Sequence, residues 1–439
     1  MRNKETNTEF TKLIESVVMI PGSCAYLYDT EIVYGNDGEP LNSLDGKESD
    51  VKKRIDTLKQ EFPNLKNVSV VVGWYFDTTN AGQLTIAPRI DDNNPIIDDT
   101  WCVGNITREE AQKSVDKQAT PSDISIFHVV QYLVDSGYNV TLYPMLFCDN
   151  KGQSWRGFIN GKSKEDIDHF FEEYKKFILH YAELKIDSIP LSALLSKFIV
   201  GSEMKDLLAY DDGTHEYYAV QKMVELTREV KAIIGEDVKT VYAANWSDYS
   251  VNSEGFYHHD PLFEAVDIVG IDVYTPITYG IPQSEITKEV IKAHWEEGIN
   301  WDYYVDEGER HPISDPKYAI KDFKYWYTHK HINSDGSVTS WKPGEKVVIA
   351  TEFGYPKVDR CTEEPYDFSV REDVNPNAQQ IAIEAGLEYW KGLREANSEL
   401  QNLFPEISIY NIDARGEGWH EHTELYDDYA TQASGHWID

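Results

Sequence analysis

Eight short apolar runs recur along the 439-residue chain, and helical patterns separate them. Several runs are apolar almost throughout instead of alternating with polar residues, which is typical of strands buried on both faces of a parallel sheet. Eight such strands alternating with helices predict an α/β fold, a (β/α)8 TIM barrel. The runs are Val17–Ile20, Val68–Tyr75, Val140–Phe147, Phe198–Gly201, Thr240–Trp246, Ile268–Tyr274, Val347–Phe353 and Ile407–Ile412.

Helix signals fall between the runs. The segment Ser163-Lys-Glu-Asp166 has the form of a capping box, and Gly235 follows a periodic segment as a natural C-terminal stop. The expected helices run from Ser163 to about Leu184, from Ser122 to Gly137 and from Glu216 to Ile234, and over Asn377–Asn397, Asp50–Glu61 and Lys317–Tyr327.

A doubly wound sheet is the alternative arrangement of such elements, but the chain has no GxGxxG or GxxxxGK[ST] motif to support it. The residues beyond the roughly 250 that a barrel needs fall in long connections that follow strands, and therefore at the C-terminal face, where barrel active sites lie. These connections are Phe76–Ser122, Thr275–Lys346 and Gly354–Val374. We expect a single domain over residues 1–439, in which 1–16 form an N-terminal extension.

Composition excludes several classes of function. The chain has 41 Lys and Arg against 76 Asp and Glu, a formal net charge of −35, which repels nucleic acid and anionic membrane surfaces. Its four cysteines form no CxxC pair, so zinc ribbons and redox motifs are not expected. The polar N-terminus has no signal-peptide core, which predicts synthesis in the cytoplasm without a signal peptide.

Two of the predicted strands end in a glutamate. Glu203 ends the fourth strand and Glu352 the seventh, on opposite sides of the expected barrel mouth. Glycoside hydrolysis needs two carboxyl groups, one to protonate the leaving oxygen and one to attack the anomeric carbon or activate water. A carboxyl separation of about 5–5.5 Å indicates retention and about 6.5–9.5 Å indicates inversion. A lone glutamate at a strand end is common, so the pair is what favours catalysis.

Aromatic and polar side chains follow the same strands. Aromatic rings stack on sugars, although packing at the barrel rim is an equally good explanation for each of them. Asn245 and Asp272 lie near strand ends, where they can bind substrate hydroxyls or orient the glutamates. The candidate substrate-binding residues are Trp74, Asn245, Trp246, Asp272, Tyr274 and Tyr355.

Metal and cofactor signals are weak. His258-His259-Asp260 and His420-Glu421-His422 contain ligand types, but there is no HExxH motif, and the side chains of adjacent histidines usually diverge. No GxSxG motif supports serine hydrolase chemistry. We therefore expect no metal and no cofactor.

The order and spacing of several segments resemble the TIM-barrel-like domain of gene transfer agent and phage tail proteins, described as glycoside-hydrolase-like. The resemblance covers nearly the whole chain from about Val17. The segments are Ile20-Pro-Gly22, Val68–Trp74, Ile199-Val-Gly-Ser-Glu203-Met, Tyr242–Tyr249, His259-Asp-Pro-Leu262, Asp267–Tyr274, Thr351-Glu352-Phe-Gly and Gly435-His-Trp437.

This resemblance implies a barrel at the tail tip or baseplate of a phage-like particle, acting on cell-envelope glycan beside other tail proteins. The family domain is usually one part of a longer hub protein, so the chain is expected to be a stand-alone version or an excised domain. The alternative function is a structural or glycan-binding tail component that does not cleave its ligand.

The layout also resembles retaining TIM-barrel glycosidases. By that resemblance Glu203 is the acid/base, Glu352 is the nucleophile, and Tyr274 is the aromatic residue that hydrogen-bonds the nucleophile. Two features depart from the pattern. Ser202 stands where those enzymes usually have Asn before the strand-4 glutamate, and the second strand carries no Arg to support the nucleophile.

Overall fold

A computed structural model of the protein describes residues 8–21, 25–91, 96, 99–115, 119–150, 154–297, 303–306, 309–312, 321–415 and 433–438. By its internal contacts the chain divides into two compact units. The first comprises Met1–Val17, Ala243–Asn411 and His420–Asp439, and the second comprises Val18–Tyr242 and Ile412–Trp419. The single domain over 1–439 stays a prediction. Within the expected N-terminal extension lie α1 (Thr8–Leu13) and the first residue of β1.

The main sheet is a closed parallel barrel of eight strands, which confirms the (β/α)8 prediction. Its order is β1-β17-β16-β13-β12-β11-β8-β2-β3, and a further pairing of β1 with β2 closes it. Apart from the short β3, spatial order follows chain order, unlike in a doubly wound sheet. The barrel strands are β1 (Ser16–Ile20), β2 (Asn67–Phe76), β8 (Asn139–Cys148), β11 (Lys197–Ser202), β12 (Lys239–Asn245), β13 (Ile268–Val273), β16 (Val348–Phe353) and β17 (Leu403–Asp413).

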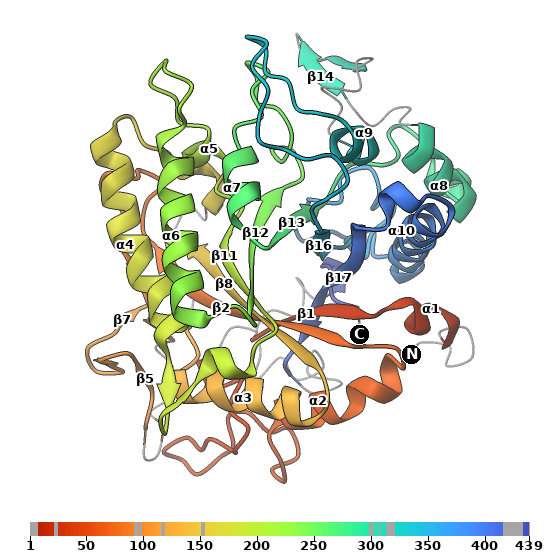
Figure 1. Ribbon diagram of the computed structural model, residues 1–439. Helices are drawn as coiled ribbons and strands as arrows, with labels where there is room; N and C mark the ends of the chain where they lie inside the picture. The colour runs from red at the N-terminus through yellow and green to blue at the C-terminus, as the bar shows by residue number, and fades with distance from the viewer. Residues whose placement is uncertain are drawn as a thin grey trace. The chain divides into compact units, whose positions relative to one another are not determined.

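In the second unit, β2, β8 and β11 pair in parallel, and long helices follow them. Figure 1 shows α4 and α6 side by side. As the sequence predicts, the Ser163 hydroxyl caps α4 by accepting from the Asp166 N–H, and the Ser122 hydroxyl caps α3 in the same way. Gly235 ends α6 with φ at 82°, a backbone conformation that favours glycine. The helices are α2 (Asp50–Glu61), α3 (Asp123–Asp135), α4 (Lys164–Glu183), α5 (Lys205–Leu208) and α6 (Tyr218–Ile234).

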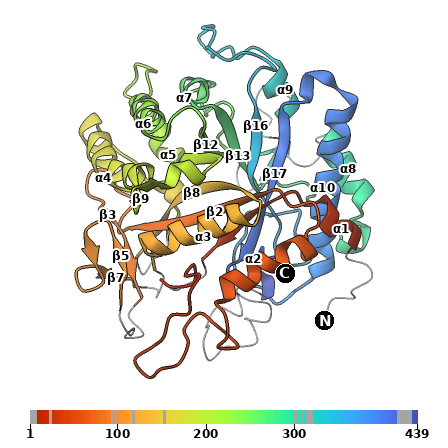
Figure 2. The ribbon, with the colours of Figure 1, turned by 60° about the horizontal axis from the view of Figure 1, so that its bottom comes forward.

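In the first unit, β13, β16 and β17 pair in parallel. Figures 1 and 2 show α8 beside α10, and Lys288 of α8 forms an ion pair with Glu388 of α10 at 2.9 Å. The helices are α7 (Asp260–Ala265), α8 (Lys288–Glu297), α9 (Phe323–Thr328) and α10 (Pro376–Ala396). In the described part of the chain, none of the helices is both long and apolar enough to cross a membrane.

Short strands lie in the connections. The predicted long connection after β2 carries five of them, and the one after β13 carries an antiparallel hairpin. They are β3 (Ile86–Ala87), β4 (Arg89–Ile90), β5 (Cys102–Val103), β6 (Ile106–Thr107), β7 (Gln112–Lys113), β14 (Tyr303–Asp306) and β15 (Glu309–Pro312). A further pair, β9 (Lys185–Ile186) and β10 (Ile189–Pro190), follows α4.

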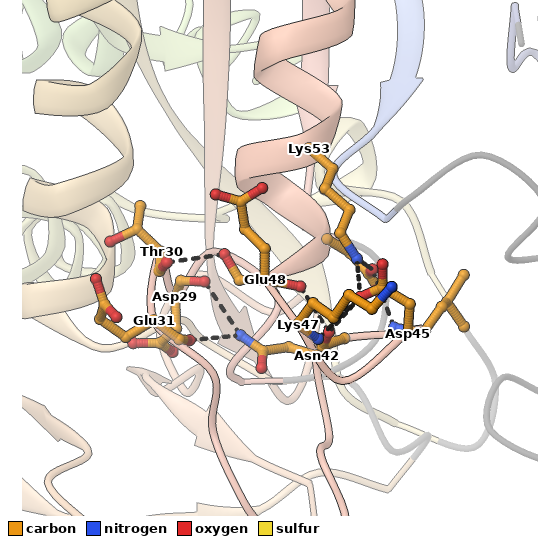
Figure 3. A network of polar contacts seen from close by, with 12 residues as sticks. Asp29, Thr30, Glu31, Asn42, Asp45, Lys47, Glu48 and Lys53 are labelled. Atoms are coloured by element: carbon orange, nitrogen blue, oxygen red, sulfur yellow. Dashed lines mark hydrogen bonds and ion pairs between the residues drawn. The ribbon is translucent and has the colours of Figure 1, made fainter.

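The loop between β1 and α2 is held together by the buried side chain of Asn42. Its amide donates to the carbonyl oxygens of Asp29 and Glu31 at 3.1 and 3.0 Å, and its own carbonyl accepts from the Val33 N–H at 2.9 Å. Figure 3 shows this amide pointing at the two carbonyl groups, with Lys53 and Asp45 paired nearby. One side chain thus satisfies several backbone groups in a loop without regular structure.

Candidate active site

Glu203 directly follows β11, and its carboxylate is held by two side chains from the loop after β8. The Arg156 guanidinium lies 2.7 Å from Oε2, and the Trp155 indole N–H donates to the same oxygen at 3.0 Å. Glu203 is 6% exposed, and its φ of 51° lies in the left-handed region. Non-glycine residues adopt this region at a cost of about 1–2 kcal/mol, and such strain is concentrated at functional sites.

Ser202 connects this arginine to the barrel. Its hydroxyl accepts from Arg156 Nη2 at 3.0 Å and lies 3.0 Å from the Tyr143 hydroxyl of β8. No role was predicted from the sequence for Trp155 or Arg156, and the arginine noted there as absent is one that supports the nucleophile, whereas Arg156 contacts Glu203. The signal that could have indicated them is a Trp-Arg pair in the loop after the third strand.

Glu352 lies in β16, one residue before the strand ends. Its Oε2 accepts a hydrogen bond from the Tyr274 hydroxyl at 2.6 Å, so the hydrogen bond implied by the glycosidase resemblance is present. Burial raises the pKa of Tyr274 well above its ordinary value, and the Glu352 charge raises it further, which keeps this hydroxyl a donor. At Gly354 a Cβ atom would lie 2.4 Å from the Tyr410 carbonyl oxygen, so the chain after Glu352 needs glycine.

Asp272 is the register partner of Glu352 on the neighbouring strand β13, and its side chain is fully buried. Its Oδ1 accepts from the Thr351 hydroxyl at 2.7 Å, and its backbone carbonyl accepts from the Trp246 N–H at 3.1 Å. Asp272 therefore ties together the ends of three strands in the first unit, through Thr351, the residue before Glu352.

Aromatic rings surround Tyr274 in the first unit. Its ring centroid lies 5.7 Å from Phe368, 6.3 Å from Tyr410 and 5.6 Å from His436. Phe368 is 50% exposed and stacks on His436 at 4.0 Å. Sequence analysis gave none of these three a role. Phe368 lies in the Gly354–Val374 connection, whose length marked it as a candidate binding loop without indicating which residue matters.

The other predicted binding residues have different surroundings. Trp246 stacks on Tyr366 of the same long connection, at 5.4 Å with an interplanar angle of 18°. The Asn245 side-chain oxygen accepts from both the backbone N–H and the hydroxyl of Ser247, which closes a turn at the end of β12.

Trp74 and Tyr355 lie in packed surroundings. The Trp74 ring stacks on Phe177 of α4 at 5.1 Å and donates to the Tyr181 hydroxyl, so the structure does not bring it to Glu203. Tyr355 is 2% exposed and packs edge-to-face on Phe353 at 5.5 Å. For these two residues the geometry favours rim packing over substrate contact.

Metal-ligand side chains gather at a separate place. Asp248, His258 and His259 lie together and are buried, and all three belong to the connection between β12 and β13. The adjacent histidines do not diverge as expected, because their ring centroids are 4.1 Å apart. His420-Glu421-His422 lies outside the described residues.

The fold has solved relatives. A β-1,4-mannanase of family GH113 superposes with a TM-score of 0.50 at 14% identity, covering 94% of this chain and 93% of that one. The GH113 β-mannanase AaManA from Alicyclobacillus acidocaldarius, in complex with ManMIm, gives a TM-score of 0.51 at 13% identity, covering 97% and 91%. At this identity the likeness establishes a glycoside-hydrolase-like fold. No curated protein sequence matches the chain.

The family is established by sequence. A barrel whose fourth and seventh strands end in glutamate is the arrangement expected from the motifs in the sequence. The sequence model of the GTA TIM-barrel-like domain matches residues 172–415, more than half of the chain, and this span contains Glu203, Tyr274 and Glu352. The chain therefore belongs to the GTA TIM-barrel-like domain family.

Proposed function

We propose that the protein is a retaining glycoside hydrolase that acts on a β-linked polysaccharide or a peptidoglycan glycan, as part of the tail of a phage-like particle. Glu352 attacks the anomeric carbon and forms a covalent glycosyl-enzyme. Glu203 donates a proton to the leaving oxygen and then accepts one from the water that releases the product. The reaction needs no cofactor.

The hydrogen bond between Tyr274 and Glu352 carries this proposal. A nucleophilic carboxylate must be oriented and must keep one oxygen for attack, and a buried neutral donor 2.6 Å from Oε2 supplies that orientation without a proton on the carboxylate. Each glutamate stands at the carboxyl end of a parallel strand, which is where the active sites of barrels lie. Opposed carboxyl groups are what glycoside hydrolysis requires.

The aromatic side chains support a carbohydrate ligand. Phe368 and Tyr366 are exposed, and both pack on rings that belong to or border strand ends in the first unit. Exposed rings held in place by other rings offer flat faces to the C–H groups of a sugar. The names of the structural relatives, β-1,4-mannanases, favour a β-linked substrate.

A second function is favoured by the ion pair between Arg156 and Glu203. The Arg156 guanidinium lies 2.7 Å from the Glu203 oxygen that also accepts from Trp155, whereas a general acid has to turn an oxygen toward the leaving group before it acts. If the ion pair persists when glycan is bound, Glu203 is only a hydrogen-bond acceptor for sugar hydroxyls. The protein is then a glycan-binding tail component that does not cleave its ligand.

The test is a turnover screen with aryl β-glycosides, β-linked polysaccharides and peptidoglycan, using the wild type and the variants Glu352→Gln, Glu203→Ala and Glu225→Gln. Glu225 is an exposed residue of α6 and serves as the control. We expect Glu352→Gln to lose turnover on the order of a thousandfold or more, because both chemical steps need the nucleophile. Glu225→Gln should match the wild type.

Glu203→Ala distinguishes retention from simple loss of activity. Azide needs no general base, so it should attack the glycosyl-enzyme in place of water and restore part of the turnover on an activated aryl glycoside. The expected product is a β-glycosyl azide. Glycan binding without turnover in any of these proteins, wild type included, would reject the hydrolase and support the binding component.

A further inference from the structure

The connection between β12 and α7 contains three buried side chains that converge on one point. Asp248 lies in the turn after β12, and His258 and His259 immediately precede α7. The three are 6%, 2% and 1% exposed, respectively. We propose that they bind one divalent transition-metal ion, with zinc as the best fit, and that this ion fixes the connection to the end of β12.

The distances fit a shared ion. His258 Nε2 lies 3.5 Å from Asp248 Oδ1, and His259 Nε2 lies 2.7 Å from Asp248 Oδ2. All three ligand atoms lie within 4.8 Å of one another. Ligand atoms about 2.1 Å from a tetrahedral zinc ion stand about 3.4 Å apart, so the two distances to Asp248 lie on both sides of the required value.

The type of ligand selects the class of metal. Two imidazole nitrogens and one carboxylate oxygen suit zinc and its first-row neighbours, whereas calcium and magnesium prefer oxygen ligands alone. One carboxylate and two neutral imidazoles carry a single negative charge, which a divalent ion more than offsets in this buried place. Three protein ligands leave a fourth position for water.

The surrounding structure holds the ligands in place. Tyr249, next to Asp248, stacks on Phe323 at 4.7 Å, and Tyr257, next to His258, stacks on His331 at 4.0 Å. The His259 ring stacks on Phe263 of α7 at 5.4 Å. Metal sites bind tightly when such packing fixes the ligands beforehand.

The role of the ion follows from the backbone. The Asp248 and Tyr249 N–H groups both donate to the Asn245 carbonyl, so the turn that carries Asp248 is continuous with the end of β12. An ion that joins this turn to His258 and His259 would clamp the loop in which Trp246 lies. Its expected effect is stability of that loop, independent of the proposed hydrolysis.

The test uses the full chain, stripped with a chelator and then titrated with zinc in competition with a chromophoric chelator. The variants are Asp248→Asn and His259→Gln, with His180→Gln as the control. His180 of α4 is also a histidine bonded to an aspartate, Asp123, at 2.7 Å, but none of the ligands packs on it. Zinc content by mass spectrometry should be one ion per wild-type chain. Binding should be about a hundredfold weaker or worse in the two cluster variants and unchanged in the control.

Binding of cobalt(II) to the wild-type protein is a second measurement, and it does not require the variants to fold. The wild-type protein loaded with cobalt should show the intense visible absorption of a four-coordinate site with nitrogen and oxygen ligands, and zinc should raise its melting temperature. A folded wild type that takes up no stoichiometric zinc or cobalt would overturn the proposal, as would equal affinity in folded Asp248→Asn. The cluster would then be a hydrogen-bonded aspartate and histidine group only.

Discussion

The surroundings of Glu203 and Glu352 differ although both residues end a barrel strand. Glu203 has a permanent cation, Arg156, and an indole N–H, and its backbone is in the left-handed region. Glu352 has a neutral phenol donor, Tyr274, and the backbone of the buried Asp272 is its register partner on the neighbouring strand. A cation lies against the first carboxylate, whereas a hydrogen bond from a neutral hydroxyl orients the second.

Strand position alone therefore does not assign a chemical role. A carboxylate held by a neutral donor remains able to attack an electrophile, whereas one paired with a guanidinium must exchange that partner before it can carry a proton. In the proposed mechanism, Glu352 is therefore already oriented in the free protein, whereas Glu203 can act only after the substrate displaces Arg156. Four measurements test this difference between the two glutamates.

The largest expected effect is on stability at Glu203. In Arg156→Leu the Glu203 carboxylate loses its cation. Both side chains of this ion pair are less than a tenth exposed in the wild type, so the loss should cost about 3–5 kcal/mol in the free energy of unfolding. Urea denaturation measures it. The double variant Arg156→Leu with Glu203→Gln should recover most of the loss, because no buried charge remains unpaired. A loss below about 1 kcal/mol would show that the ion pair is not structural.

The next effect concerns pH on the Glu352 side. Burial lowers the pKa of His436 to about 4 from its ordinary 6.5, so between these values the unfolded chain binds a proton that the folded chain does not. Stability should therefore fall as pH drops through this window, by about 3 kcal/mol from this residue. His436→Gln should flatten that part of the stability curve measured by urea denaturation from pH 7 to pH 4. An unchanged slope in the variant would contradict the assignment.

Tyr274→Phe removes the hydroxyl that Glu352 accepts from. A hydrogen bond to a charged group contributes about 1.5–3 kcal/mol, so kcat on the best aryl glycoside should fall about 10- to 100-fold while KM changes little. Tyr355→Phe is the matched control, because Tyr355 is equally buried and packs on Phe353. Equal losses in the two variants would mean that Tyr274 has no special relation to the chemistry.

The smallest effect is on the exposed ring beside Tyr274. In Phe368→Ala a sugar loses one stacking surface, worth about 1 kcal/mol, so KM or the dissociation constant for oligosaccharide should rise about fivefold. The control is Val370→Ala. Val370 lies in the same connection and is 58% exposed, but it has no ring, so this variant should bind oligosaccharide as the wild type does. Isothermal titration calorimetry compares them, and equal affinities in both variants would remove Phe368 from the binding surface.

Sequence predicted the barrel well because its strands are buried on both faces. All eight expected strands are present, and most bounds agree within one residue. β17 begins four residues before the predicted run, since Pro405 and Glu406 interrupt its apolar pattern. α6 begins at Tyr218 and not at Glu216. α9 (Phe323–Thr328) overlaps the end of the predicted Lys317–Tyr327 segment, of which residues 317–320 lie outside the described part of the chain. α7 was missed, because six residues are too few for a helical period to show.

At the candidate site, strand-end position in the sequence indicated the two glutamates, because it is a local property, and the resemblance to retaining glycosidases implied the Tyr274 contact. Neither identified Arg156, Phe368 or His436. Each of these contacts its partner from a long connection or from near the C-terminus. The apolar periodicity of a helix or strand, which the sequence shows, therefore gives no information about them.

The amino-acid sequence by itself determined the barrel, the caps of its helices and the strand ends at which glutamates stand, because apolar periodicity and capping act over a few neighbouring residues. The tertiary structure alone decided which side chains hold each glutamate, that Trp74 packs on α4, and that His258 and His259 turn toward Asp248. These outcomes depend on the folding of loops, where one side chain such as Asn42 satisfies backbone groups that are distant in sequence. Such contacts are selected by burial and hydrogen bonding in the folded chain, and local sequence carries no record of them.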